Sequence, residues 1–173
     1  MNPCSGNPTV VIGLGSNVPD RLRWLKCGVK GFRSAEGIEI VAVSKVYESA
    51  PVGEGFEGDF LNAILVGTTN IPPMELLKVC FSVERGCGRD REREQTLANR
   101  NRTLDCDIIF YGDLVIKETE LEIPHPRWKE RAFVVLPLLD VAEFLTEHQR
   151  KEVLKAYQEL PQGSCQVLNN VLD

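Results

Sequence analysis

The chain has 173 residues, of which 43% are hydrophobic and 26% are charged, a balance typical of one folded globular domain. Its net charge of −5 argues against general nucleic-acid binding, and its longest apolar runs are too short to span a bilayer. Six cysteines at irregular spacing indicate free thiols, and no signal peptide is recognisable at the start. We therefore expect a monomeric, cytoplasmic domain over residues 1–173, without a nucleic-acid or membrane partner.

The first elements are a buried strand and a helix. The apolar run of residues 10–14 indicates a buried strand over residues 9–14. The glycine-rich residues 13–17 indicate a tight turn before a helix start. A dinucleotide-binding loop would need a third glycine where Val18 stands. Apolar side chains then recur at helical spacing from residue 22 to residue 32, and Gly28 is placed for a close contact with a neighbouring element.

Two strands and a second helix follow. Alternating and apolar residues predict strands over residues 38–47 and 60–68, joined by the glycine-rich loop 49–59. The proline pair at residues 72–73 predicts a helix that ends near Gly86. Because no helix separates these two strands, the order argues against a doubly wound parallel sheet.

The second half of the chain begins with a basic segment. Residues 85–102 contain six arginines against three acidic residues, which favours an anionic ligand in an otherwise acidic protein. A strand over residues 102–110 follows, then a hairpin, a short helix from Ala132 and a polar-faced helix within a C-terminal extension over residues 144–173. The order β-α-β-β-α-β predicts an α+β, ferredoxin-like fold, an antiparallel sheet with two helices on one face.

Two aspartates interrupt the apolar strand of residues 102–110. Because side chains alternate along a strand, Asp105 and Asp107 share one face, about 6.6 Å apart at Cα, while Cys106 faces the core. Two neighbouring carboxylates repel each other, and this spacing suits one or two Mg²⁺ ions held together with substrate phosphates. The alternative is a solvated strand face, although Asp is unfavourable in strands.

Other functions remain compatible with these features. A metal-dependent phosphohydrolase could use the same two acids, and a ferredoxin-like sheet could bind RNA or a small regulator without chemistry. RNA-binding sheets are basic and expose aromatic residues, whereas this chain has a net charge of −5.

Seven short segments stand in a recognisable order: residues 13–17 (GLGSN), 46–53 (VYESAPVG), 59–63 (DFLNA), Glu84 with 88–91 (GRDR), 102–108 (RTLDCDI), 123–126 (IPHP) and 131–137 (RAFVVLP). Together they resemble the 6-hydroxymethyl-7,8-dihydropterin pyrophosphokinase family of folate biosynthesis, over about residues 10–143. The resemblance implies the ferredoxin-like fold and transfer of the diphosphate of ATP to the hydroxymethyl group of the pterin, which releases AMP.

The resemblance also implies roles for individual residues. Asp105 and Asp107 would hold two Mg²⁺ ions, and Arg91 and Arg102 would neutralise charge on the phosphates during transfer. Both arginines would contact ATP, and the other implied ATP contacts are Glu84, Ile108, His125 and Arg131. The implied pterin contacts are the stacking residues Phe60 and Phe133, the amide of Asn62, and the backbone around Ser49, Ala50 and Val52. From the residues alone, Glu84 could equally be an exposed acid at a helix end, and both phenylalanines could be core residues.

The segment before Arg102 departs from the family pattern. The family usually has an aromatic residue and Gly-Pro there, whereas this chain has Asn99-Arg100-Asn101. The arginines that could supply the missing contacts are Arg89, Arg93 and Arg100. We expect the loops at residues 50–59 and 88–101 to close over bound substrates.

Overall fold

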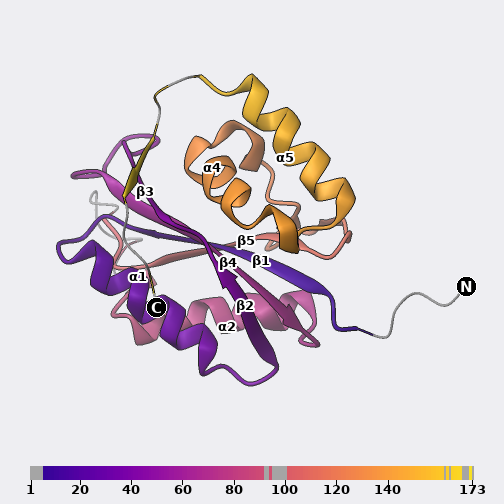
Figure 1. The fold of residues 1–173 in the computed structure, drawn as a ribbon. Coiled ribbons are helices and arrows are strands. Elements are labelled where there is room, and N and C mark those ends of the chain that lie inside the picture. Colours follow the sequence, from indigo (N-terminus) through magenta and orange to yellow (C-terminus); the bar gives the residue numbers. More distant parts are fainter. Residues whose placement is uncertain are drawn as a thin grey trace, which may run out of the picture.

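The structure is a computed structural model that describes residues 6–91, 94, 101–161, 163, 165–168 and 172. A central antiparallel sheet has helices on both faces, so the fold is α+β (Figure 1). The strands of this sheet are β1 (Thr9–Ser16), β2 (Ile38–Val43), β3 (Val46–Ser49), β4 (Phe60–Thr69), β5 (Asp105–Tyr111) and β8 (Gln166–Leu168). They are ordered β5-β1-β4-β3-β8, with β2 also paired to β4. A separate hairpin, predicted from the sequence, joins β6 (Ile116–Lys117) to β7 (Glu122–Ile123).

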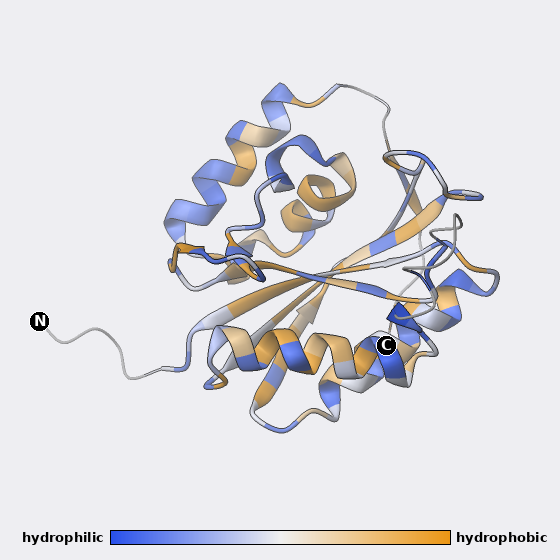
Figure 2. Cartoon of the chain, turned by 180° about the vertical axis from the view of Figure 1, so that it is seen from behind, coloured by the Kyte–Doolittle hydropathy of each residue, from blue (hydrophilic) through white to orange (hydrophobic). Residues whose placement is uncertain are grey.

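The helices form two layers. On one face lie α1 (Arg21–Arg33) and α2 (Pro73–Gly86), and on the other lie α4 (Ala132–Asp140) and α5 (Glu147–Glu159) (Figure 1). The expectation of helices on a single face was therefore incomplete. The reason is that β4 is buried on both of its faces, so the sheet needs an apolar cover on each side. Figure 2 shows the resulting arrangement, with hydrophobic strands between the layers and a largely hydrophilic α5.

The close contact expected at Gly28 is present. Leu25, Val29 and Phe32 are buried on the sheet-facing side of α1. A Cβ at Gly28 would stand only 2.9 Å from a methyl group of Leu104, the residue just before β5. The missing side chain therefore lets α1 approach the strand that carries the two aspartates.

The tight turn predicted for residues 13–17 is wrong. These glycines lie inside β1, which pairs with β4 as far as Ser16 on one side and with β5 as far as Gly15 on the other. The following helix begins only at Arg21, after Asp20 with a φ of 65°, so neither Ser16 nor Asn17 caps it. Pairing on both sides outweighs the local preference of glycine for turns.

Two other differences arise from long-range pairing. The strand expected over residues 38–47 is divided at Ser44, whose hydroxyl accepts the backbone N–H of Ile64 at 2.8 Å. In addition, β8 pairs with the edge of β3, which the tail sequence did not predict. The five cysteines within the described ranges are free thiols, whereas Cys4 lies outside those ranges. No helix among the residues described here combines the length and the apolar character needed to cross a membrane.

Candidate active site

A cavity of about 440 Å³ lies on the sheet face that also carries α4. Its walls come from β1, β4 and β5, the loop after β3, and the start of α4. Most of the predicted site residues line this cavity: Ser49, Ala50, Val52, Phe60, Asn62, Arg102, Asp105, Asp107, His125, Arg131 and Phe133. Glu84, Arg91 and Ile108 do not. Ile108 is 4% exposed and belongs to the core on the opposite face.

Strand register explains how distant residues meet at the cavity floor. Gly15 of β1 is paired with Asp105 of β5 on one side and with Asn62 of β4 on the other. A Cβ at Gly15 would lie 3.4 Å from the Asn62 amide oxygen and 3.9 Å from the Asp105 Cβ. Because Gly15 has no side chain, the cavity floor between Asp105 at the acidic end and Asn62 at the amide end is unobstructed.

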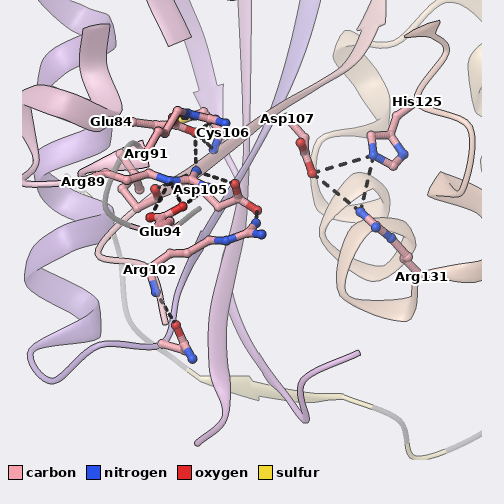
Figure 3. A network of polar contacts seen from close by, with 12 residues as sticks. Glu84, Arg89, Arg91, Glu94, Arg102, Asp105, Cys106, Asp107, His125 and Arg131 are labelled. Carbon is pink, nitrogen blue, oxygen red and sulfur yellow. Dashed lines mark hydrogen bonds and ion pairs between the residues drawn. The ribbon is translucent and has the colours of Figure 1, made fainter. Parts of the chain in front are cut away.

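At the acidic end, Asp105 is held by two arginines. Its Oδ1 accepts from Nη1 of Arg89 and its Oδ2 from Nη1 of Arg102, each at 2.6 Å (Figure 3). Burial acts to raise the pKa of the Asp105 carboxyl, but the charges of Arg102 and Arg89 outweigh burial and hold this pKa below its usual value. Asp105 is therefore ionised at neutral pH.

Asp107 is more open. Its carboxylate lies 3.5 Å from Nη1 of Arg131 and 3.8 Å from Nε2 of His125, and its side chain is 41% exposed (Figure 3). Burial and the neighbouring charge of Asp105 raise the pKa of Asp107 to about 6. Burial and the charge of Arg131 lower the pKa of His125 to about 4, so His125 is neutral at pH 7. The partly exposed carboxylate can thus take a cationic ligand in addition to its contact with Arg131.

Behind Asp105 lies a buried ion-pair cluster. Glu84 is 1% exposed and contacts both Arg89 at 2.7 Å and Arg91, and it accepts the backbone N–H of Cys106 at 2.8 Å. This excludes the alternative of an exposed helix-end acid. Arg89 also pairs with Glu94 at 3.0 Å, and only 3% of its side chain is exposed. Glu84 therefore acts on the cavity through Arg89 and through the backbone of β5.

The structure places Arg89, rather than Arg91, beside the acid pair. Arg91 pairs with Glu84 and covers the ring of Phe81 at 4.2 Å, with 42% of its side chain exposed. Arg89 was only one of several candidates in the sequence, because a loop arginine gives no local sign of its burial. Two other candidates, Arg93 and Arg100, lie outside the described residues.

At the other end, Asn62 is 5% exposed and its amide nitrogen donates to the Ser49 hydroxyl at 3.0 Å. Phe60 and Phe133 both line the cavity and are only partly buried, although Phe133 also packs against the core on this face. Phe56 lines it as well, with its ring centroid 5.3 Å from that of Phe60. Sequence reasoning missed Phe56, and the available signal was an aromatic residue inside a glycine-rich loop.

The donor set constrains what ion the site can hold. Among the residues that the structure describes, no group of three or more His, Cys, Asp or Glu side chains is arranged to bind a metal. Asp105 and Asp107 offer carboxylate oxygens, which suit Mg²⁺ when phosphates and water supply the remaining ligands. The pair therefore fits a metal that arrives with a phosphate ligand.

Comparison with known proteins agrees with this geometry. The family model described as 7,8-dihydro-6-hydroxymethylpterin-pyrophosphokinase (HPPK) matches residues 11–143. Two relatives named 2-amino-4-hydroxy-6-hydroxymethyldihydropteridine pyrophosphokinase are each 37% identical to the chain. The one from Methylorubrum extorquens matches over 76% of this chain and 80% of its own, and the one from Aquifex aeolicus over 87% and 90%.

Solved structures show the same fold. A crystal structure of Plasmodium falciparum HPPK-DHPS with pteroate superposes with a TM-score of 0.65 at 14% identity. The match covers 88% of this chain and 44% of that larger chain, so this chain spans less than half of its length. The family match over residues 11–143 and the two bacterial relatives are sufficient to assign the chain: it belongs to the 7,8-dihydro-6-hydroxymethylpterin-pyrophosphokinase family.

Proposed function

We propose that this protein transfers the diphosphate of ATP to the hydroxymethyl group of 6-hydroxymethyl-7,8-dihydropterin and releases AMP, a step of folate biosynthesis. One observation carries the proposal beyond family membership. A single cavity contains an acid pair with arginines at one end and an aromatic and amide wall at the other, connected across Gly15. A bound pterin at the amide end would present its hydroxymethyl group toward phosphates at the acidic end.

At the phosphate end, the cations that line the cavity bind and orient the triphosphate. Arg102 and Arg131 provide fixed positive charge close to Asp105 and Asp107. Guanidinium groups match phosphate oxygens in pairs and stabilise charge that develops during transfer. Neutral His125 lies 3.4 Å from Arg131 through Nε2 and supports the orientation of that guanidinium. We propose Arg91 and Glu84 as further contributors that act from outside the cavity.

We propose Asp105 and Asp107 as the residues that hold two Mg²⁺ ions delivered with ATP. When bound, the ions would neutralise phosphate charge and polarise the phosphorus under attack. In the structure described here both oxygens of Asp105 accept from arginines. Arg102 is therefore placed to exchange its carboxylate partner for a phosphate when the substrate arrives.

At the pterin end, Phe60 and Phe133 are proposed to stack on the faces of the ring. The Asn62 amide, oriented by Ser49, reads the donors and acceptors along the ring edge. Backbone groups around Ala50 and Val52 complete that edge. The proposed Ile108 contact would be through its backbone, because its side chain is buried in the opposite core.

The fold and organisation carry further proposals. The strand order, with β1 between β4 and β5 and with β3 outside β4, supports the ferredoxin-like plan. Contacts of α4 with α5 and pairing of β8 with β3 support one domain over residues 1–173. We propose a monomer located in the cytoplasm, which size-exclusion chromatography and cell fractionation would test.

The deciding experiment is product analysis. Protein with MgATP and hydroxymethyldihydropterin should form AMP only when the pterin is present, whereas ADP or phosphate without pterin would indicate a hydrolase. Asp107→Asn should abolish AMP formation, and Asp20→Asn, the same change at an exposed residue outside the cavity, should not. Absence of pterin-dependent AMP from the unmodified protein would refute the function.

A further inference from the structure

Asn101 joins the two loops that flank the cavity. Its side-chain oxygen accepts the backbone N–H of Glu57 at 2.8 Å and the side-chain N–H of Asn17 at 2.6 Å. Its amide nitrogen donates to the Glu57 carboxylate at 3.2 Å. One side chain thus connects the glycine-rich loop after β3 to the segment that leads into β5.

The base of this connection is rigid. Asn17 is 5% exposed and follows directly after β1. Its side-chain oxygen accepts the backbone N–H of Arg102 at 2.8 Å, and its backbone N–H donates to the Arg102 carbonyl at 3.2 Å. Asn101 is therefore fixed to the sheet, and it lies one residue before an arginine that lines the cavity.

The connection also sets the position of an aromatic ring. Gly55 and Gly58 have φ values of 88° and 92°, so two left-handed residues bracket Phe56 and Glu57. The Phe56 ring lies 5.8 Å below the Arg102 guanidinium and 5.3 Å from the Phe60 ring. Holding Glu57 therefore places Phe56 between the phosphate end and the pterin end of the cavity.

We propose that Asn17, Asn101 and Glu57 form a clasp, and that Asn101 is a positioning residue for the pterin. The clasp holds the loop of residues 50–59 in its binding conformation before the substrate arrives. A loop that is already ordered loses less conformational entropy on binding, so the clasp lowers the pterin concentration needed for turnover. This inference rests on the proposed function, and it concerns KM rather than the chemical step.

The test reverses the donor and the acceptor between two side chains. Asn101→Asp keeps the acceptor for Asn17 and for the Glu57 N–H, but it removes the donor and opposes two carboxylates. Loss of this hydrogen bond together with repulsion between the two carboxylates should raise the KM for the pterin roughly tenfold, with kcat within about twofold of the unmodified protein. In the double variant Asn101→Asp/Glu57→Gln, the new glutamine amide can donate to the new carboxylate, so KM should return to within about threefold.

Two further variants complete the test. Asn70→Asp makes the same chemical change at an exposed residue beyond the far end of β4, and it should leave KM unchanged. Glu57 is exposed, so Glu57→Ala tests the clasp without risk to folding, and KM should rise about threefold. An active Asn101→Asp variant with unchanged pterin KM, or a double variant no better than the single one, overturns the inference alone. An unmodified protein without pterin-dependent AMP overturns the proposed function as well.

Discussion

Replacement of either cavity aspartate by asparagine should abolish activity but change stability in opposite directions. The pKa of Asp107 rises from 3.8 to about 6, because burial and Asp105 disfavour its charge in the folded protein. Without any solvent screening, such a rise in pKa corresponds to about 3 kcal/mol of destabilisation of the folded protein. The side chain is 41% exposed, so solvent screening leaves about 1 kcal/mol. Asp107→Asn should therefore raise the free energy of unfolding by about 1 kcal/mol at pH 7.5.

Asp105 is expected to behave differently. It accepts from Arg89 and Arg102, each at 2.6 Å, and these charges lower its pKa in spite of burial. Asparagine cannot balance the buried Arg89, although Glu84 and Glu94 remain as partners. Loss of one partner from a buried network should reduce the free energy of unfolding by about 2 kcal/mol.

Urea unfolding followed by tryptophan fluorescence, in EDTA to remove divalent ions, measures both effects. The gain from Asp107→Asn should be nearly complete at pH 7.5 and should shrink as the pH falls through about 6. It should disappear below pH 3.8, where the unmodified carboxyl is protonated in both the folded and the unfolded state. Asp20→Asn serves as the matched control. A variant at Asp107 less stable than the unmodified protein, or equal losses at both aspartates, would refute the electrostatic reasoning.

Three further predictions concern the cavity floor, acid stability and the core. Gly15→Ala adds a methyl group 3.4 Å from the Asn62 side-chain oxygen, a distance that the fold tolerates. Because this methyl group occupies the cavity floor, the variant should raise the KM for the pterin about tenfold. An unchanged KM would contradict the proposed position of the pterin. The pKa of His125 is lowered to about 4 by burial and nearby arginines, so folding stability is lost as the pH falls below 6.5. Between pH 7.5 and 5 the unmodified protein should lose about 2 kcal/mol more than His125→Gln, and equal losses in urea titrations would refute this. In Gly28→Val, the new Cβ would lie 2.9 Å from a methyl group of Leu104 and would clash with it. The variant should lower the free energy of unfolding by about 2 kcal/mol, and Gly28→Ala should lower it by less.

The local pattern of the chain was sufficient for most secondary structure and for the acid pair. Alternation over residues 105–108 determines that Asp105 and Asp107 share a face while Cys106 and Ile108 enter the core. Helical spacing of apolar residues likewise predicted α1 and α2, and the proline pair marked the start of α2. These features depend on neighbours within one or two turns, so the sequence by itself determines them.

Tertiary structure decided the features that depend on pairing between distant segments. Gly15 belongs to a strand rather than a turn only because β4 and β5 pair on both sides of it. Arg89, rather than Arg91, contacts Asp105, because the carboxylates of Glu84, Glu94 and Asp105 converge on its buried guanidinium. Residue type and spacing cannot reveal such convergence, since its energy arises from desolvation and charge contacts that exist only in the folded protein.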